Sequence, residues 1–492
     1  MLKKANELFC SFASQKIVYC HWKSNEHLLA GLNGVTDLDV LVAPKDRENA
    51  TSWLRRCEYE RLKSQFGARY ADVEDWVSMD EETGKLLHVH LHYRMITGQK
   101  GIKEYELPWA ELALETRQLD GNENVFITDP NLEIIILLSR IGLKLKFSSL
   151  VKCLFGLYTI SRSDEREIRY LQNRINTERV KAIAKAYFED PDELCSLAFA
   201  VSLDSLWLRR VRAVVVRNLR KYRTLPLLTL ILRSVFFRVS MSFASRIKEY
   251  LPLTVITKKT LEQRGLIIAI IGQDGAGKST VSTDCVKWLR WKLEAERCYL
   301  GSGDHYRSVE KLLRKKISKS RNIVFKLLYG YLTVLDDLKL SRRTAKKLLR
   351  ADSYRKKGAI AIFDRYPQTA YPGINDGPKI RTYVGRFSFP SLIGHYFNHL
   401  AGREERNLEK ALTIQPDIVI KLMLSPEESV RRKPAESLDT VRKKSEIIQN
   451  LRFPSSRLFT VDATQPYETE LLEIRRIIWN EIRASQRFNE RV

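Results

Sequence analysis

The stretch Leu266–Thr280, LIIAIIGQDGAGKST, decides the fold of the C-terminal half of this 492-residue chain. Its six apolar residues, Leu266–Ile271, predict a strand that is buried on both faces of a parallel sheet. The next eight residues, Gly272–Ser279, have the spacing G-x-x-x-x-G-K-S, in which the glycines let the backbone wrap a phosphate with N–H groups. A helix is expected to begin at about Ser279, so that the positive end of its dipole points at the same phosphate. The pattern predicts a binding site for a nucleoside triphosphate.

Two side chains of this loop have specific expected roles. Lys278 places a positive charge near the β- and γ-phosphates, and the Ser279 hydroxyl can ligate Mg²⁺. The alternative is a glycine-rich loop that only resembles a phosphate loop, and the strand before it and the helix after it argue against that alternative. The residues expected to contact the nucleotide are Gly272, Gln273, Asp274, Gly275, Ala276, Gly277, Lys278, Ser279 and Thr280.

A second buried strand is expected at Ala359–Phe363, directly before Asp364, Arg365 and Tyr366. An acid at the carboxyl end of a strand beside the phosphate loop can hold the Mg²⁺ shell, and an arginine next to it can grip a phosphoryl group with two hydrogen bonds. Asp364 is therefore a predicted metal ligand and catalytic residue, and Arg365 a predicted catalytic residue together with Lys278.

With this motif the chain resembles the thymidylate kinase family, which has D-R-Y in the same place after its phosphate loop. Three further segments resemble that family in the same order: Gln415–Leu422 its P-D-apolar strand, Pro426–Lys433 its lid entry, and Leu458–Thr464 its last strand and adenine-side loop. The resemblance covers most of residues 263–492. It implies a parallel five-stranded sheet with a helical lid, the cofactors ATP and Mg²⁺, and transfer of the γ-phosphate to a nucleoside monophosphate such as thymidine monophosphate.

The resemblance also implies where the lid would act. Gly275 stands where some members of the family place an arginine, and in such variants the lid supplies arginines to the transferring phosphate. Arg431 and Arg432 are therefore candidate catalytic residues, with Arg442 as a further candidate. The other interpretation of these charges is a solvated helix face.

The acceptor is the least determined part of the expected reaction. By resemblance, Asp274 would lie near the acceptor sugar and Arg365 would hold the acceptor phosphate. Residues 367–378 form a segment rich in proline and glycine, where the family usually has an A-Y-Q-like helix that reads the thymine. A sugar or glycan phosphate acceptor therefore stays open, as does an NTP-binding scaffold whose catalytic domains are degenerate.

The N-terminal part carries a different pattern, Ser24 followed by Asp37-Leu38-Asp39 on an expected strand. Two carboxylates that point to one face of a strand repel each other, so the pair favours a divalent cation between them. This spacing resembles the nucleotidyltransferase superfamily, in which a Gly-Ser turn precedes a D-x-D strand. The helix at 47–57 and the strands at 59–62, 69–73 and 86–92 are expected to complete that fold.

Histidines stand where the superfamily usually has a third carboxylate. His88, His90 and His92 share one face of the expected strand 86–92, and we expect it to be the face that carries the aspartates. One interpretation is a metal site with mixed oxygen and imidazole ligands, formed by Asp37, Asp39 and His90. The other is a relic domain whose histidines are hydrogen-bonded on a half-buried strand.

The chain is too long for one core, and three parts are expected: a nucleotidyltransferase-like domain at 1–125, a helical basic connecting domain at 126–262 and a thymidylate kinase-like domain at 263–492. The fold class is thus α/β with an α+β N-terminal domain. The net charge of +25 falls mainly on the second and third parts, which carry +11 and +18 against −4 for the first. This distribution suits anionic ligands and leaves nucleic acid and anionic lipid open as partners.

Residues 205–248 contain eleven Lys and Arg and neither Asp nor Glu, with apolar runs between the arginines. Such a stretch can lie in the headgroup region of an anionic membrane or pack as a helical hairpin with arginines turned outward, and we favour the packed hairpin. No window of eighteen uninterrupted apolar residues occurs, which argues against a membrane-spanning helix.

The remaining features indicate a cytoplasmic protein. Its seven cysteines are scattered without a C-x-x-C pair, and the N-terminus turns polar too soon for a signal peptide. The expected partners are a nucleotide and a phosphorylated small-molecule acceptor, with no requirement for nucleic acid. A homodimer stays open.

Overall fold

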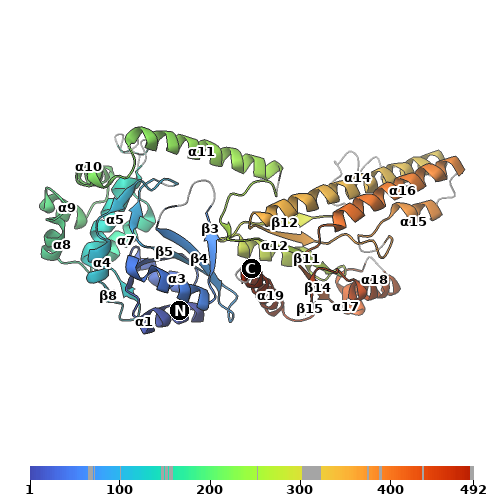
Figure 1. Cartoon of the computed structure of the whole chain (residues 1–492), viewed down its shortest axis with the longest axis horizontal. Helices are drawn as coiled ribbons and strands as arrows, with labels where there is room; N and C mark the ends of the chain where they lie inside the picture. The colour runs from blue at the N-terminus through green and yellow to red at the C-terminus, as the bar shows by residue number, and fades with distance from the viewer. Residues whose placement is uncertain are drawn as a thin grey trace. The chain divides into compact units, whose positions relative to one another are not determined.

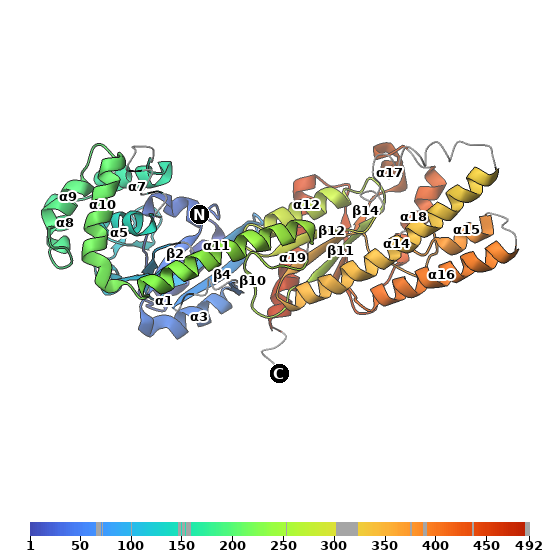
Figure 2. The same ribbon diagram turned by 90° about the horizontal axis from the view of Figure 1, so that it is seen from above.

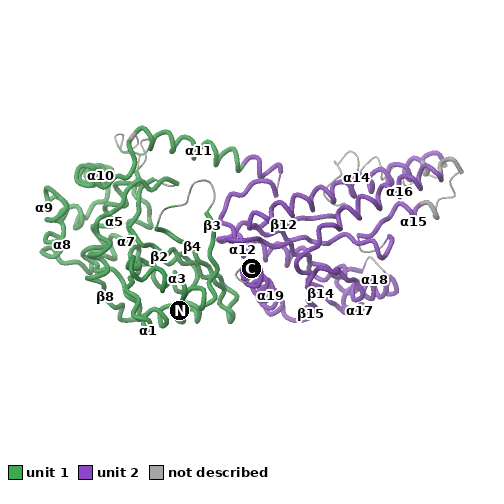
Figure 3. The backbone as a smooth tube through the Cα atoms, viewed as in Figure 1, with its two compact units in different colours: residues 1–245 green, residues 246–492 purple. Residues whose placement is uncertain are grey.

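The computed structural model describes residues 1–64, 70, 72–99, 101–145, 149, 153, 159–251, 253–301, 323–373, 376–386, 391–434 and 437–487. The chain forms two compact units, Met1–Ser245 and Arg246–Val492, which Figure 3 shows in different colours. The division into three domains at residues 125 and 262 stays a prediction. The sequence predicts a polar, basic loop at 304–322 and the start of a linker at Pro252, and both lie outside the described residues, as do residues 374 and 375 of the 367–378 segment.

The C-terminal unit is built on a five-stranded parallel sheet in the order β12-β13-β11-β14-β15. Its central strand is the apolar run identified from the sequence, and both neighbouring strands are as deeply buried as it is. The strands are β11 (Ile267–Gly272), β12 (Ala295–Tyr299), β13 (Ile360–Asp364), β14 (Ile418–Met423) and β15 (Arg457–Asp462). Because all of them run the same way, their carboxyl ends meet at one edge of the sheet.

Helices connect these strands and cover the sheet. The long helix α14 lies beside α16, as both ribbon views show (Figures 1 and 2), and the two carry a small apolar core of their own. The helices of this unit are α12 (Lys278–Leu289), α14 (Ile323–Lys356), α15 (Ile380–Arg386), α16 (Ser391–Leu412), α17 (Pro426–Arg432), α18 (Leu438–Asn450) and α19 (Tyr467–Arg487). A two-residue strand, β10 (Thr260–Leu261), precedes the sheet in the chain.

The N-terminal unit contains a mixed sheet with the order β3-β4-β5-β2-β1-β9-β8. Strand β2 pairs in parallel with β5, and β1 with β9, while the other pairings are antiparallel. The strands are β1 (Tyr19–His21), β2 (Leu38–Val42), β3 (Glu60–Lys63), β4 (Val73–Met79), β5 (Leu86–His92), β8 (Gln118–Leu119) and β9 (Phe126–Ile127), with a separate hairpin of β6 (Met95–Thr97) and β7 (Tyr105–Leu107).

Two apolar cores hold this unit together. One lies between the sheet and the first helices, and the second is formed mainly by the later helices around α5. The α-helices are α1 (Lys3–Ser14), α2 (Leu28–Leu32), α3 (Arg47–Arg56), α4 (Ala110–Glu115), α5 (Pro130–Lys144), α7 (Arg162–Gln172), α8 (Thr177–Ala184), α9 (Pro191–Ala198) and α10 (Ser205–Leu219), and a further helix, α11 (Leu227–Tyr250), begins in this unit and ends past its boundary at Ser245. Short 3₁₀ turns lie at Asn25–His27, Pro44–Asp46 and Arg220–Tyr222.

The structure corrects two predicted helices of this unit and places one strand later in the chain. Of the strand expected at 69–73, residues 69 and 71 lie outside the described residues, and β4 begins at Val73. The sequence predicts helices at 164–187 and 192–222. Each range instead contains two helices, because an Asn or Asp side chain caps a new helix inside it: Asn176 caps α8 and Asp204 caps α10. Apolar periodicity alone does not reveal these internal caps.

Within residues 205–248, which the favoured interpretation expected to be packed, α10 is packed and one face of α11 is exposed. Helix α10 buries Trp207, Val211 and Val215 against α5 and its neighbours. Helix α11 is long and apolar enough to cross a membrane by length and composition, but only 11% of its most apolar window is buried.

Candidate functional site

The phosphate loop lies at the carboxyl edge of the parallel sheet, between the ends of β13 and β14. A Cβ at Gly272 would lie 2.6 Å from the Leu422 carbonyl oxygen, so only glycine lets β11 approach β14 this closely. Gly277 has a φ of +79° and is the N-terminal cap of α12, a left-handed conformation that side chains disfavour. The two glycines of the motif thus have different tasks, one in packing and one in turning the chain into the helix.

Lys278 points back over the loop. Its ammonium donates to the carbonyl oxygens of Gly272 at 3.0 Å and Gln273 at 2.7 Å, and it lies 3.8 Å from the Asp274 carboxylate. Burial lowers the pKa of Lys278, and the charge of Asp274 opposes that shift. The ammonium is therefore held at the mouth of the loop by groups that a phosphate oxygen could replace.

Gln273 has a structural task in this loop. Its side chain is buried, donates to Ser445 Oγ at 2.5 Å and accepts a hydrogen bond from the Leu424 N–H at 2.8 Å. The side chain therefore anchors the loop to the segment after β14 and to α18. Only its backbone faces the position expected for phosphate.

Asp364 ends β13 beside the first turn of α12. Its Oδ2 accepts from Ser279 Oγ at 2.5 Å and from Arg297 Nη2 at 3.0 Å, and its side chain is 1% exposed. Its other oxygen, Oδ1, is buried and meets no hydrogen-bond donor among the described residues. A buried carboxylate oxygen without a partner is costly, so this atom marks a place for a further ligand.

Arg365 follows Asp364 and bridges two carboxylates, 3.6 Å from Asp274 and 3.5 Å from Asp376. It has a φ of +84°, a left-handed conformation that is strained for a residue with a side chain. The resemblance to thymidylate kinases did not anticipate Asp376, which lies in the proline- and glycine-rich segment. This segment therefore supplies a partner for the arginine that precedes it.

Several cations surround Asp274. Burial raises the pKa of the Asp274 carboxyl, but the positive charges of Lys278, Lys433 and Arg365 together lower it by more. The pKa of Asp274 is therefore below its ordinary value. Lys444 of α18 also lies 3.7 Å from this carboxylate. The loop is therefore an electropositive site that keeps Asp274 ionised.

The expected lid arginines lie on α17 and α18, where they pair with acids of α17. Arg431 and Arg432 both pair with Glu428, at 2.6 and 2.8 Å, and Arg442 pairs with Glu427 at 3.1 Å. Helix α17 itself contacts the phosphate loop, because Ser429 Oγ donates to the Asp274 carbonyl oxygen at 2.7 Å. All three arginines are therefore paired with carboxylates of α17, and Arg432 also donates to the Ala463 carbonyl oxygen at 3.3 Å.

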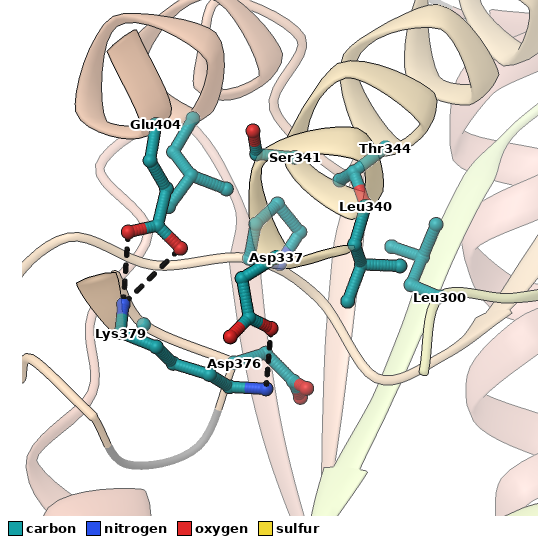
Figure 4. A pocket seen from close by; sticks show the side chains of 11 residues that line it. Leu300, Asp337, Leu340, Ser341, Thr344, Asp376, Lys379 and Glu404 are labelled. Carbon is teal, nitrogen blue, oxygen red and sulfur yellow. Dashed lines mark hydrogen bonds and ion pairs between the residues drawn. The ribbon is translucent and has the colours of Figure 1, made fainter. Parts of the chain in front are cut away.

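A small pocket opens next to Asp376, between α14, α16 and the loop after β13, and Figure 4 shows its lining. Asp337 lies 3.8 Å from Lys379 Nζ, and Glu404 accepts hydrogen bonds from the backbone N–H groups of Lys379 and Ile380. Burial raises the pKa of each of the three acids that line the pocket, Asp337, Asp376 and Glu404. Its cavity of about 40 Å³ has room for two or three waters, so a larger ligand would have to open it.

Sequence reasoning missed several residues of this site, among them Arg297, Asp376 and Lys444. Arg297 lies on β12 and reaches Asp364 only because β12 pairs with β13. No local motif marks these residues. The one sequence signal that could have pointed to Arg297 is its position inside the predicted strand 297–300, whose other residues are apolar.

The N-terminal unit places Asp39 on β2 in register with His90 on β5, and Asp37 directly precedes β2. The two aspartates fall in separate groups rather than in one site. His90 Nδ1 lies 3.3 Å from Asp39 Oδ1, and His88 Nδ1 lies 3.0 Å from Asp37 Oδ1. Two groups have ligand atoms within 4.8 Å of one another: Asp37 with His88 and His90, and Asp39 with His90 and His92. His90 belongs to both groups.

A third carboxylate lies beside these histidines, on β4 rather than on β5. Asp75 Oδ1 is 2.7 Å from His90 Nε2 and 3.4 Å from His88 Nε2. Because the sequence analysis ended the preceding strand at Val73, it did not place Asp75 on this sheet. The cluster thus contains more oxygen ligands than expected.

Lys23 occupies the other side of the cluster. Its ammonium lies 2.8 Å from Asp39 Oδ1, and although burial raises the pKa of Asp39, Lys23 and the histidines hold it well below its ordinary value. Ser24 has a left-handed backbone, and Arg140 donates to its hydroxyl at 3.3 Å. Burial lowers the pKa of His92 to about 3. Lys23 thus lies against the group that contains Asp39, His90 and His92.

Comparison with known proteins gives two similar proteins from Escherichia coli (strain K12). The chain is 28% identical over 220 residues to the uncharacterized ATP-binding protein YghR, and 27% identical over 227 residues to the uncharacterized ATP-binding protein YghS. Each alignment covers 42% of this chain, together with 84% of YghR and 89% of YghS. No protein-family model matches the chain. The chain is therefore similar over less than half its length to proteins that are described as ATP-binding.

Proposed function

We propose that this chain is a Mg-ATP-dependent phosphotransferase of the thymidylate kinase type. The observation that carries the proposal is the grouping of Lys278, Ser279, Asp364 and Arg365 at the carboxyl edge of one parallel sheet. Nucleotides bind at that edge in open α/β sheets, and the loop there has the chemistry of a triphosphate site. The description of YghR and YghS as ATP-binding proteins supports the same ligand.

The residues present also fit Mg²⁺. Ser279 and Asp364 would hold the ion, and the partnerless Oδ1 of Asp364 supplies the kind of oxygen ligand that Mg²⁺ prefers. When bound, the ion would neutralise charge on the β- and γ-phosphates. Arg297 holds Asp364 in position from β12.

The protein residues divide the reaction between a donor side and an acceptor side. Lys278 and the loop N–H groups bind the β- and γ-phosphates of ATP, while Arg365 holds the acceptor phosphate. An oxygen of that phosphate forms a bond to the γ-phosphorus as the bond to the β–γ bridging oxygen breaks, and ADP leaves. Arg431 and Arg432 would exchange Glu428 for the transferring phosphate when the nucleotide binds. Arg432 already lies beside the loop, since a Cβ at Gly275 would be 3.4 Å from Arg432 Cβ.

The test of this proposal is γ-phosphate transfer from radiolabelled ATP to a panel of acceptors, with the full-length protein and Mg²⁺. The panel contains nucleoside monophosphates, sugar phosphates and unphosphorylated sugars. Labelled product with any acceptor supports a phosphotransferase. ATP binding without transfer to any acceptor would instead favour a nucleotide-binding scaffold.

The pocket beside Arg365 favours a hydroxyl-rich acceptor over thymine. Three acids and two hydroxyl side chains line it, and Lys379 is its single cation among the described lining residues. Carboxyl groups accept hydrogen bonds from sugar hydroxyls, whereas a thymine ring needs specific readers at its polar edge. The observation favours a sugar or glycan phosphate as the acceptor.

We therefore expect thymidine monophosphate to be an unexceptional acceptor. The measurement is kcat/KM for thymidine monophosphate against other monophosphates and sugar phosphates. A preference for thymidine monophosphate of a hundredfold or more, about 2.7 kcal/mol, would show that the loop after Arg365 reads thymine after all.

For the N-terminal unit we propose a nucleotidyltransferase-like domain that binds a divalent transition metal. The D-x-D strand β2 beside the parallel strand β5 supports the fold, and the grouping of Asp37, His88 and His90 supports the metal. Mixed imidazole and carboxylate ligands favour ions such as Zn²⁺ or Co²⁺ over Mg²⁺.

Removal of His90 should therefore weaken metal binding at this site. With full-length protein carrying Ser279→Ala, which removes the hydroxyl ligand of the phosphate loop, Co²⁺ titration should give an absorption band of imidazole-ligated cobalt. Adding His90→Ala should lower the Co²⁺ affinity by about tenfold or more. His27→Ala, which changes an imidazole outside the cluster, is the control. Equal affinity with and without His90 would remove this histidine from the site.

A further inference from the structure

The outward face of α11 carries a continuous apolar stripe. Seven large apolar side chains follow each other at helical spacing, and Phe236, Leu228 and Phe243 are 75%, 70% and 66% exposed. The stripe consists of Leu228, Ile231, Leu232, Val235, Phe236, Val239 and Phe243. At 1.5 Å per residue it is about 22 Å long. Isolated exposed apolar residues are ordinary in soluble proteins, but a contiguous stripe of this length indicates an interaction surface.

The opposite face of α11 is attached to the N-terminal unit. Leu230 and Ala244 are buried, and Ser234 Oγ donates to Gln99 Oε1 at 3.3 Å. The Phe237 ring lies against Gly101, where a Cβ would approach it to 2.5 Å. These residues recur at the same helical spacing as the stripe, half a turn away from it. One side of the helix is therefore attached to the protein, and the opposite side, which carries the stripe, is exposed.

Arginines flank the stripe. At 100° per residue, Arg233 and Arg238 fall on its two opposite borders, and both side chains are exposed. Arg246 follows about one turn after Phe243. Between residues 205 and 248 there is no acidic residue to pair with them. An apolar stripe with positive charge along both borders matches the boundary between acyl chains and anionic headgroups.

We propose that α11 lies in the plane of an anionic phospholipid membrane and docks the protein there through this stripe. The apolar side chains enter the boundary of the acyl chains while Arg233 and Arg238 remain at headgroup level. This inference is independent of the proposed phosphotransferase activity, because none of these residues belongs to the phosphate site.

The attachment of the helix argues for an in-plane position. A spanning helix would have to leave Gln99 and Gly101, and would carry Arg233 and Arg238 into the hydrocarbon region, where each is costly. Two copies of the helix facing each other would bring the arginine rows of both molecules close together without acids between them. Anionic lipid is the partner that meets both the apolar stripe and its charged borders.

The test is cosedimentation of the full-length protein with vesicles of phosphatidylcholine and phosphatidylglycerol, compared with vesicles of phosphatidylcholine alone. We expect binding to the anionic vesicles that weakens when salt rises from about 0.1 M to 1 M, because the Debye length falls from about 10 to 3 Å. Binding to phosphatidylcholine alone should be much weaker.

Two double variants separate the apolar and the charged contributions. Phe236→Gln with Phe243→Gln should lower the vesicle affinity by about a hundredfold or more, since two large apolar side chains no longer leave water. Arg233→Gln with Arg238→Gln should lower it by roughly thirtyfold on anionic vesicles only. Arg209→Gln with Arg217→Gln removes the same charge from exposed positions of α10 and should change it by less than about threefold.

Several outcomes would overturn the proposal. One is wild-type binding by the Phe236→Gln, Phe243→Gln protein, and another is an equal loss in the α10 control, which would mean unspecific attraction of a basic protein. A dimer in solution that the same phenylalanine changes dissociate, without vesicle binding, would assign the stripe to a second copy. If detergent releases the protein from the vesicles but neither salt nor carbonate does, α11 spans the membrane instead of lying in its plane.

Discussion

Replacing Lys278 with alanine should lower the rate of γ-phosphate transfer by roughly two to four orders of magnitude. The Lys278 ammonium lies at the mouth of the phosphate loop, where carbonyl oxygens of Gly272 and Gln273 hold it in place. The transferring phosphoryl group gains charge on its oxygens in the transition state, and this ammonium is the loop's own positive charge. Its loss therefore costs more in the transition state than in ATP binding.

The measurement is single-turnover transfer from labelled ATP, together with the Kd for ATP. Lys287→Ala, which removes an exposed lysine from the same helix, is the matched control and should leave the rate unchanged. A Lys278→Ala protein with the turnover of the unmodified chain would contradict the proposed phosphate site.

The sequence was informative where a function depends on residues close together in the chain. The strand β11, the loop and the start of α12 occupy fourteen consecutive positions, so their order alone determines their geometry. The same is true of β13, which ends in Asp364. The five-stranded parallel sheet implied by the family resemblance matches the observed one in number and direction of strands.

Prediction failed where the partners come from distant segments. Asp376 joins Arg365 through a segment that the sequence marked only as rich in proline and glycine, and Lys444 reaches Asp274 from α18. Asp75 meets His90 because β4 pairs with β5 in a particular register. Such contacts depend on tertiary packing, which no local pattern contains.

Helix α11 illustrates a different limit. Its apolar residues occupy both faces, so periodicity does not tell which face packs against the protein. Phe237 is covered through its contact with Gly101, whereas its neighbour Phe236 is 75% exposed. Which of the two phenylalanines faces the protein is determined by the positions of Gln99 and Gly101 in the fold, which the sequence does not reveal.

The largest effect on the acceptor side is expected at Arg365. Arg365→Ala should lower kcat/KM for the acceptor by roughly two to four orders of magnitude, with little change in the Kd for ATP. The guanidinium lies between Asp274 and Asp376, where it can hold the acceptor phosphate with two hydrogen bonds. Arg365→Lys keeps the positive charge but cannot form the bidentate hydrogen bonds of a guanidinium, so this variant should retain only part of the activity.

A glycine variant separates this role from a role in folding. Because Arg365 has a φ of +84°, Arg365→Gly relieves a backbone strain of about 1–2 kcal/mol and should be at least as stable as the unmodified protein in thermal unfolding. A stable but nearly inactive Arg365→Gly protein would show that the strained conformation is retained for the contact with the acceptor. Full activity in that variant would instead mean that the Arg365 guanidinium does not hold the acceptor phosphate, which would then have to bind elsewhere.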